Sequence, residues 1–70
     1  MTEIFENVSS EMKQMISSFI DIALASVDPK KIPKLISDFV NIMPTEEAAN
    51  FVDFYFRLKL EELRNGSNNN

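Results

Sequence analysis

The segment from Thr45 to Arg64, TEEAANFVDFYFRLKLEELR, constrains the fold most, because its hydrophobic residues cover far more than one face of a helix. At about 100° per residue they span an arc of roughly 240°. They are Ala48, Ala49, Phe51, Val52, Phe54, Tyr55, Phe56, Leu58, Leu60 and Leu63. A helix on the surface of a globular protein needs an apolar stripe little wider than about 100°. A chain of 70 residues has little with which to cover this helix, so a second chain is the expected cover.

Composition limits the ways in which so short a chain can be stable. Proteins of this size commonly need a disulfide, a metal, an unusually good core or a partner chain. The sequence has no Cys and no His, which excludes disulfides and removes the thiolate and imidazole ligands of metal sites. We therefore predict one helical domain over residues 1–64, completed by a second copy of the chain, and a disordered tail over residues 65–70.

The first predicted helix runs from Glu3 to Ser26, with Thr2 as its N-cap. Its apolar residues recur in steps of three and four and share an arc of about 160°. They include Phe5, Val8, Met12, Met15, Phe19 and Ile22, and Ile4, Ile16, Ile20, Ala23 and Val27 widen the same face. This pattern is typical of an amphipathic helix that packs in a bundle.

Proline residues mark both breaks between helices. Asp28-Pro29 can cap and start a second helix that reaches about Met43, but Pro33 removes an internal hydrogen bond if the helix starts at Pro29. Either the first turn is irregular or the regular helix begins nearer Pro33. Pro44-Thr45 is the second break, with Thr45 as a cap, and the third helix ends at about Arg64 before Asn65-Gly66.

The short connections predict an all-α fold in which neighbouring helices are antiparallel or sharply angled. We expect three helices per chain in an intertwined or side-by-side homodimer, with the third helix at its centre. On this helix Val52 is expected to be interior. Phe54 lies near the border of the apolar arc, beside the polar stripe of Asn50, Asp53, Arg57 and Glu61, and is expected nearer to a subunit or partner boundary.

No pattern in the sequence points to catalysis. Nucleophilic catalysis needs a nucleophile and a base, and the serines lie on polar faces or in the tail. The adjacent carboxylates Glu46-Glu47 and Glu61-Glu62 diverge on a helix, and a single Gly does not allow a glycine-rich phosphate loop. We expect no enzymatic activity, no cofactor and no metal.

Two groups of residues are candidates for binding a partner. The aromatic part of the third helix, with Phe51, Phe54, Tyr55 and Leu58, is either core and dimer interface or a contact for a different protein. Lys30, Lys31 and Lys34 form the one locally positive patch in an acidic chain of net charge −4. They are either a solvated helix start or a contact for an acidic partner surface.

These observations favour a small non-enzymatic regulatory protein that binds itself and a second protein, as an inhibitor, an anti-activator or an adaptor. The alternative is a structural component that only self-associates. A nucleic-acid-binding dimer is disfavoured by the acidic charge. The polar faces of the amphipathic helices are not basic, which disfavours membrane binding. No positive region precedes an apolar stretch after Met1, so a cytoplasmic location is expected.

Overall fold

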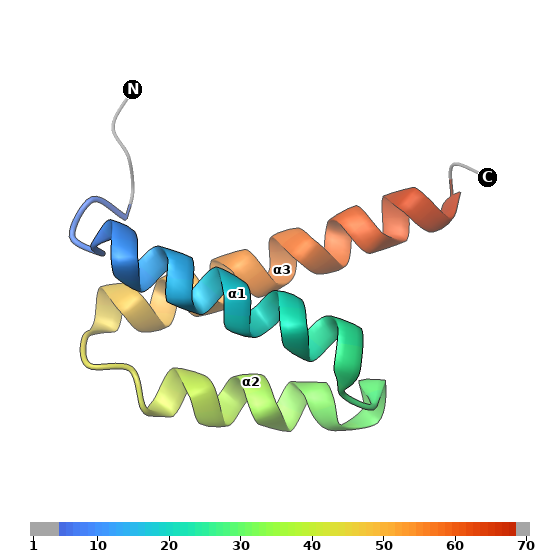
Figure 1. Ribbon diagram of the computed structural model, residues 1–70, viewed down its shortest axis with the longest axis horizontal. Helices are drawn as coiled ribbons and strands as arrows, with labels where there is room; N and C mark the ends of the chain where they lie inside the picture. The colour runs from blue at the N-terminus through green and yellow to red at the C-terminus, as the bar shows by residue number, and fades with distance from the viewer. Residues whose placement is uncertain (1–4, 69–70) are drawn as a thin grey trace.

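The computed structural model describes residues 5–68, and all regular structure in that range is helical. The elements are α1 (Ser10–Ser26), a short 3-10 helix η1 (Pro29–Lys31), α2 (Ile32–Asn41) and α3 (Glu46–Asn68) (Figure 1). The predicted all-α class with three helices is therefore confirmed for the chain.

The three helices surround one core, but α3 extends beyond the region where it packs against α1 and α2. α1 and α2 run in opposite directions, while α3 crosses α1 and then diverges from it, so that its last turns extend beyond the other helices (Figure 1). The Cα radius of gyration is 12.8 Å. A compact domain of this length has a radius of about 11 Å, and the projecting part of α3 contributes to the difference.

The core gathers apolar side chains from each helix and from the turn before α1. It consists of Val8, Ile16, Ile20, Ile32, Ile36, Phe39, Phe51 and Val52. Ile16, Ile20 and Val52 have no exposed surface, which confirms the predicted interior position of Val52. β-branched aliphatic residues dominate this cluster, and their stiff side chains pack at low entropic cost.

The first helix begins later than the sequence predicted. Residues 5–8 form a turn, in which the Val8 N–H donates to the Phe5 carbonyl at 3.0 Å, and α1 begins at Ser10. The N-cap is Ser9, whose hydroxyl accepts a hydrogen bond from the Met12 N–H at 3.1 Å. The predicted start at Glu3 was wrong because the apolar residues of the turn fall on the helical period by chance. Thr2 and Glu3 themselves lie outside the described residues.

After the break at Asp28 the chain forms an irregular turn before the regular helix, as the position of Pro33 suggested. The Asp28 carboxylate accepts a hydrogen bond from the Lys30 N–H at 3.0 Å and caps η1. The regular helix α2 starts at Ile32, which places Pro33 in its first turn, where a missing N–H costs nothing. α2 ends at Asn41, two residues before the predicted end at Met43, and its last carbonyls accept shorter-range bonds from Ile42 and Met43.

The start of α3 agrees with the sequence and its end does not. The Thr45 hydroxyl accepts a hydrogen bond from the Ala48 N–H at 3.1 Å, as expected of a cap. The helix continues past Arg64 and through Gly66 to Asn68. Glycine permits a left-handed residue but does not require one, and no described residue has a positive φ. Asn69 and Asn70 lie outside the described residues, and the division into a domain over 1–64 and a disordered tail stays a prediction.

The N-cap at Ser9 can be tested by a single substitution. We expect Ser9→Ala to lower the free energy of unfolding by about 1 kcal/mol, since the first turn of α1 loses its side-chain cap. Ser10→Ala, at the next position and also exposed, is the matched control and should change stability little. Urea denaturation followed by circular dichroism measures both. Equal effects of the two variants would place the cap elsewhere.

The central position of Val52 leads to a second prediction. Val52→Asp places an unpaired carboxylate among fully buried aliphatic side chains, which costs several kcal/mol, on the order of the whole stability of a small domain. We expect the variant to be unfolded by circular dichroism at neutral pH. A cooperative thermal transition close to that of the native chain would contradict the core described above.

Candidate functional site

The predicted partner-binding residues lie in two separate parts of the molecule. Phe51, Phe54, Tyr55 and Leu58 occupy the middle of α3, whereas the lysines lie at the connection between α1 and α2. Lys30, Lys31 and Lys34 line a shallow hollow with Val27, Leu35 and Asp38, and no residue of α3 lines it. The structure therefore does not combine the aromatic and basic groups into one site.

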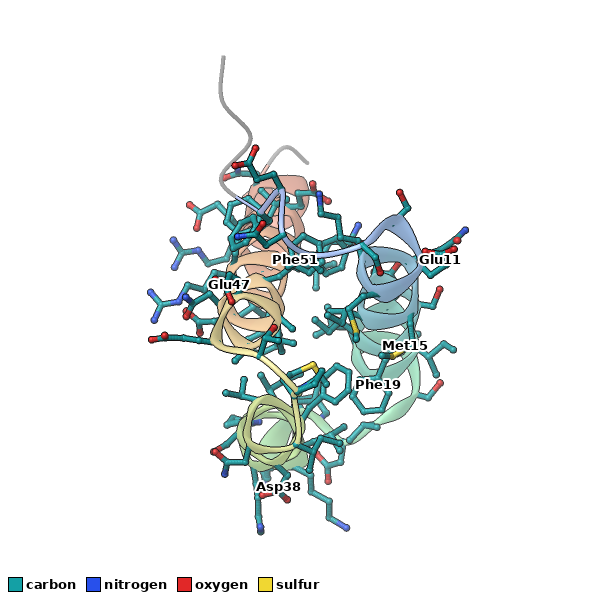
Figure 2. All side chains as sticks on the ribbon, turned by 90° about the vertical axis from the view of Figure 1, so that its left-hand side faces the viewer. Glu11, Met15, Phe19, Asp38, Glu47 and Phe51 are labelled. Atoms are coloured by element: carbon teal, nitrogen blue, oxygen red, sulfur yellow. The ribbon has the colours of Figure 1, made fainter. Side chains whose placement is uncertain are left out.

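The aromatic group is divided between the core and the surface. Phe51 is buried and belongs to the core. Figure 2 shows it on the side of α3 that faces α1. Phe5 from the N-terminal turn packs against both Phe51 and Phe54, with ring centroids 5.2 and 5.1 Å apart. Phe54 keeps 43% of its surface exposed, and Leu58 is exposed beside it. Only this outer pair, Phe54 and Leu58, is open to a partner.

Tyr55 connects α3 to α1 through a side-chain hydrogen bond. Its hydroxyl donates a hydrogen bond to the Asp21 carboxylate at 3.1 Å. Lys59 lies over the Tyr55 ring, 5.6 Å from its centroid, and its Nζ is 3.9 Å from Asp21 and 3.3 Å from Glu62. Partial burial and the hydrogen bond to Asp21 raise the pKa of Tyr55 above its ordinary value, although the positive charge of Lys59 opposes the shift. These contacts stabilise the crossing of two helices.

A second hollow, which we call the notch, opens where α3 diverges from the body. One wall is formed by Leu24 of α1 with Ile32 and Pro33 at the start of α2. The other wall is formed by Phe56, Leu60 and Leu63 of α3. Leu60 and Leu63 are exposed, and Leu63 keeps 58% of its surface open. The notch is therefore a wedge with apolar side chains on both walls.

Ile22 and Ile42, the two most exposed large hydrophobic residues of the described chain, lie on a third surface, the α1–α2 face, which also includes the exposed Met15 and the half-buried Leu35. Phe19 of α1 and Phe39 of α2 touch, with ring centroids 4.2 Å apart. Met15 and Ile22 flank Phe19 by one helical turn, and Leu35 and Ile42 flank Phe39 in the same way. The four residues therefore surround the aromatic contact; Ile22 is 64% and Ile42 73% exposed. Figure 2 shows Met15 and Phe19 on the same helix, with Phe19 nearer to α2.

The lysine hollow adjoins the α1–α2 face, because Leu35 belongs to both. Lys34 is paired with Asp38 at 3.1 Å. Among the described residues, Lys30 and Lys31 form no ion pair within the chain, and both side chains are exposed. One end of the α1–α2 face is therefore positively charged in a protein that is acidic as a whole.

The residues between 5 and 68 do not bring together three acidic side chains in a group that could hold a metal ion. In the same range, no helix has both the length and the apolar character that a bilayer-spanning segment needs. Comparisons of the chain with models of protein families, with curated proteins and with solved structures find no match.

Sequence reasoning missed the notch and the α1–α2 face. It placed Ile22 on the packed face of the first helix, because an arc of about 160° does not reveal which edge a neighbouring helix leaves open. The signal for the notch was present: Val52, Phe56, Leu60 and Leu63 recur in steps of four, four and three along one stripe. A helix of 23 residues that packs against helices of 17 and 10 residues must expose part of such a stripe.

The contact of Tyr55 with Asp21 predicts a pH-dependent stability. Because folding raises the pKa of this phenol, the neutral form is favoured in the folded chain. Its contribution is complete below the unfolded pKa of about 10 and is lost as the pH rises through the folded value. We expect Tyr55→Phe to lower the free energy of unfolding by about 1 kcal/mol at neutral pH, because one hydrogen bond is lost. At alkaline pH the variant should lose less stability than the native chain, because it has no phenol to ionise.

The measurement is direct because Tyr55 is the one tyrosine and the chain has no tryptophan. Alkaline titration of the near-ultraviolet phenolate absorbance should give a pKa above 10.0, the ordinary value. Asp21→Asn is the control and should bring the pKa closer to that value. A normal pKa in the native chain would show that the two side chains do not meet in solution.

Proposed function

We propose that this chain is a small non-enzymatic regulatory protein that acts by binding another protein, and that it does so as a homodimer. The observation that carries this proposal is the α1–α2 face, where Ile22 and Ile42, the two most exposed large hydrophobic residues of the described chain, lie beside the contact of Phe19 with Phe39. Single exposed hydrophobic residues are normal on a protein surface. A contiguous group of them is characteristic of an interaction surface.

The shape of the α1–α2 face favours a helical partner segment. Two antiparallel helices with apolar edges present a shallow groove between them, and an amphipathic helix can place its apolar face in such a groove. Met15 at one end of the groove adds a flexible side chain that adapts to the shape of the partner. The adjoining Lys30 and Lys31 favour acidic residues at one end of the bound segment, because charge complementarity steers and orients association.

Recovery of partners from the native host tests the proposal. Tagged native chain and an Ile42→Asp variant are compared, followed by mass spectrometry. Because Ile42 is largely exposed, the variant should fold normally while its new carboxylate disrupts the apolar groove. A partner that the native chain retains and Ile42→Asp loses supports the proposal. If only the chain itself is recovered, the alternative of a purely self-associating structural component is favoured.

The lysine hollow gives a further expected outcome. We expect the triple variant Lys30→Glu, Lys31→Glu, Lys34→Glu to fold like the native chain, because all three side chains are exposed. Partner binding should weaken, and added salt should weaken the native complex as well, since exposed charge pairs are screened. Isothermal titration of the recovered partner at low and high salt measures both effects. Unchanged affinity in the triple variant would make the lysines ordinary solvated residues.

A further inference from the structure

One apolar stripe of α3 runs from the centre of the core to the open end of the helix. Val52 is completely buried, Phe56 is half-buried, and Leu60 and Leu63 are exposed. These residues lie within an arc of about 80° on the helix, so they form one continuous surface. α1 and α2 cover its first half, and among residues 5–68 nothing covers the second half as completely. The exposed part of the stripe is therefore a continuation of the core without its cover.

The last part of α3, residues 57–68, which we call the overhang, has little support from the rest of the chain. Lys59 is half-buried, whereas every side chain described from Leu60 to Gly66 is exposed. No side chain lies within 4 Å of the position that a Cβ atom would have at Gly66. Isolated helices shorter than about 12 to 15 residues are marginal in water. A regular helix at this position is stabilised when a second molecule covers its apolar side.

We propose that a second copy of this chain supplies that cover: the overhang of each chain lies in the notch of the other, with the two α3 helices antiparallel about a two-fold axis near Leu60. This inference rests on the homodimer proposed above and assigns its surface. The chain has both complementary parts next to each other, a projecting apolar helix end and an apolar wedge. In a two-fold symmetric dimer both copies use the same surface, so each overhang meets the notch of the other chain in one arrangement.

The charges of the overhang favour a second copy over a strongly charged partner. Residues 57–68 carry Arg57, Lys59 and Arg64 against Glu61 and Glu62, a net charge of +1, whereas the whole chain has −4. The acidic excess therefore lies elsewhere, and two copies that meet here bring together mixed charges of both signs. Oppositely charged side chains at the rim can pair across an antiparallel arrangement of the same helix.

The area available also favours reciprocal contact. The overhang of 12 residues is about 18 Å long and, with its side chains, about 10 Å wide. A contact through the overhang of one chain alone covers too little of this surface for a stable dimer, which needs roughly 800 Å² per partner. Reciprocal contact uses the overhang and the notch of both chains, and so it doubles the area that one overhang alone would bury.

The outer pair Phe54 and Leu58 is the competing dimer surface. It lies at least about 120° around α3 from the middle of the exposed stripe of Leu60 and Leu63. Phe5 already covers part of Phe54, and neither the lysine hollow nor the notch is lined by Phe54 or Leu58. The same helix therefore has two exposed apolar sides, and a pair of substitutions distinguishes them.

Sedimentation equilibrium of the full chain at micromolar concentration provides the test. We expect a dimer for the native chain and on the order of 100-fold weaker dimerisation for Leu63→Asp, because a central contact of the interface is replaced by a charge. Ile42→Asp is the matched control: it adds the same charge in place of a residue at least as exposed, and should leave dimerisation unchanged. Circular dichroism checks that both variants fold.

Introduced cysteines give a second, independent measurement, because the native chain has none. Under mild oxidation we expect Leu60→Cys, near the two-fold axis, to form a covalent dimer, and Ile42→Cys to remain largely uncoupled. A native chain that stays monomeric would overturn both the homodimer and this interface. A native dimer that Leu63→Asp leaves intact and Phe54→Asp disrupts would retain the homodimer and overturn the notch as its surface.

Discussion

The contact among Ile16, Ile20 and Val52 is the interaction on which the rest of the structure depends. These three side chains are the largest that are completely buried, and they belong to one core cluster, with two of them on α1 and one on α3, the helices that cross in Figure 1. Because the crossing lies in the first half of α3, the second half must diverge from the body. The notch, the overhang and the exposed ends of the apolar stripe all follow from the position of this one contact along a helix of 23 residues.

The sequence was sufficient to predict three helices, both breaks, the caps at Asp28 and Thr45 and the interior position of Val52. Each of these depends on local chemistry or on periodicity. The start of α1 was not predictable in this way, because Phe5 and Val8 contribute to the core from a turn while they match the helical period. The end of α3 was missed for the opposite reason: Asn65-Gly66 permits a stop, but no tertiary contact there makes the chain reverse.

The candidate surfaces were predicted less well than the fold, because exposure depends on how helices of unequal length are placed. Phe51 and Tyr55 looked like partner contacts on a helical wheel, but the chain itself uses them, Phe51 in the core and Tyr55 at Asp21. Ile22 looked like a packed residue of the first helix and is open. A helical wheel gives the direction of a side chain around its own axis and says nothing about whether another helix reaches that far along it.

The proposed dimer and the proposed partner face use different parts of the same small body, and this separation has a thermodynamic consequence. A dimer that covers the overhang adds a stabilisation that grows with the concentration of the chain, since association removes folded monomers from the unfolding equilibrium. The α1–α2 face lies on α1 and α2, which the core contact holds to α3. Self-association therefore stabilises the helices that form the partner face without covering it, and a dimer presents two such faces to a partner. Binding to a partner with two target segments then gains from the proximity of the second segment after the first has bound.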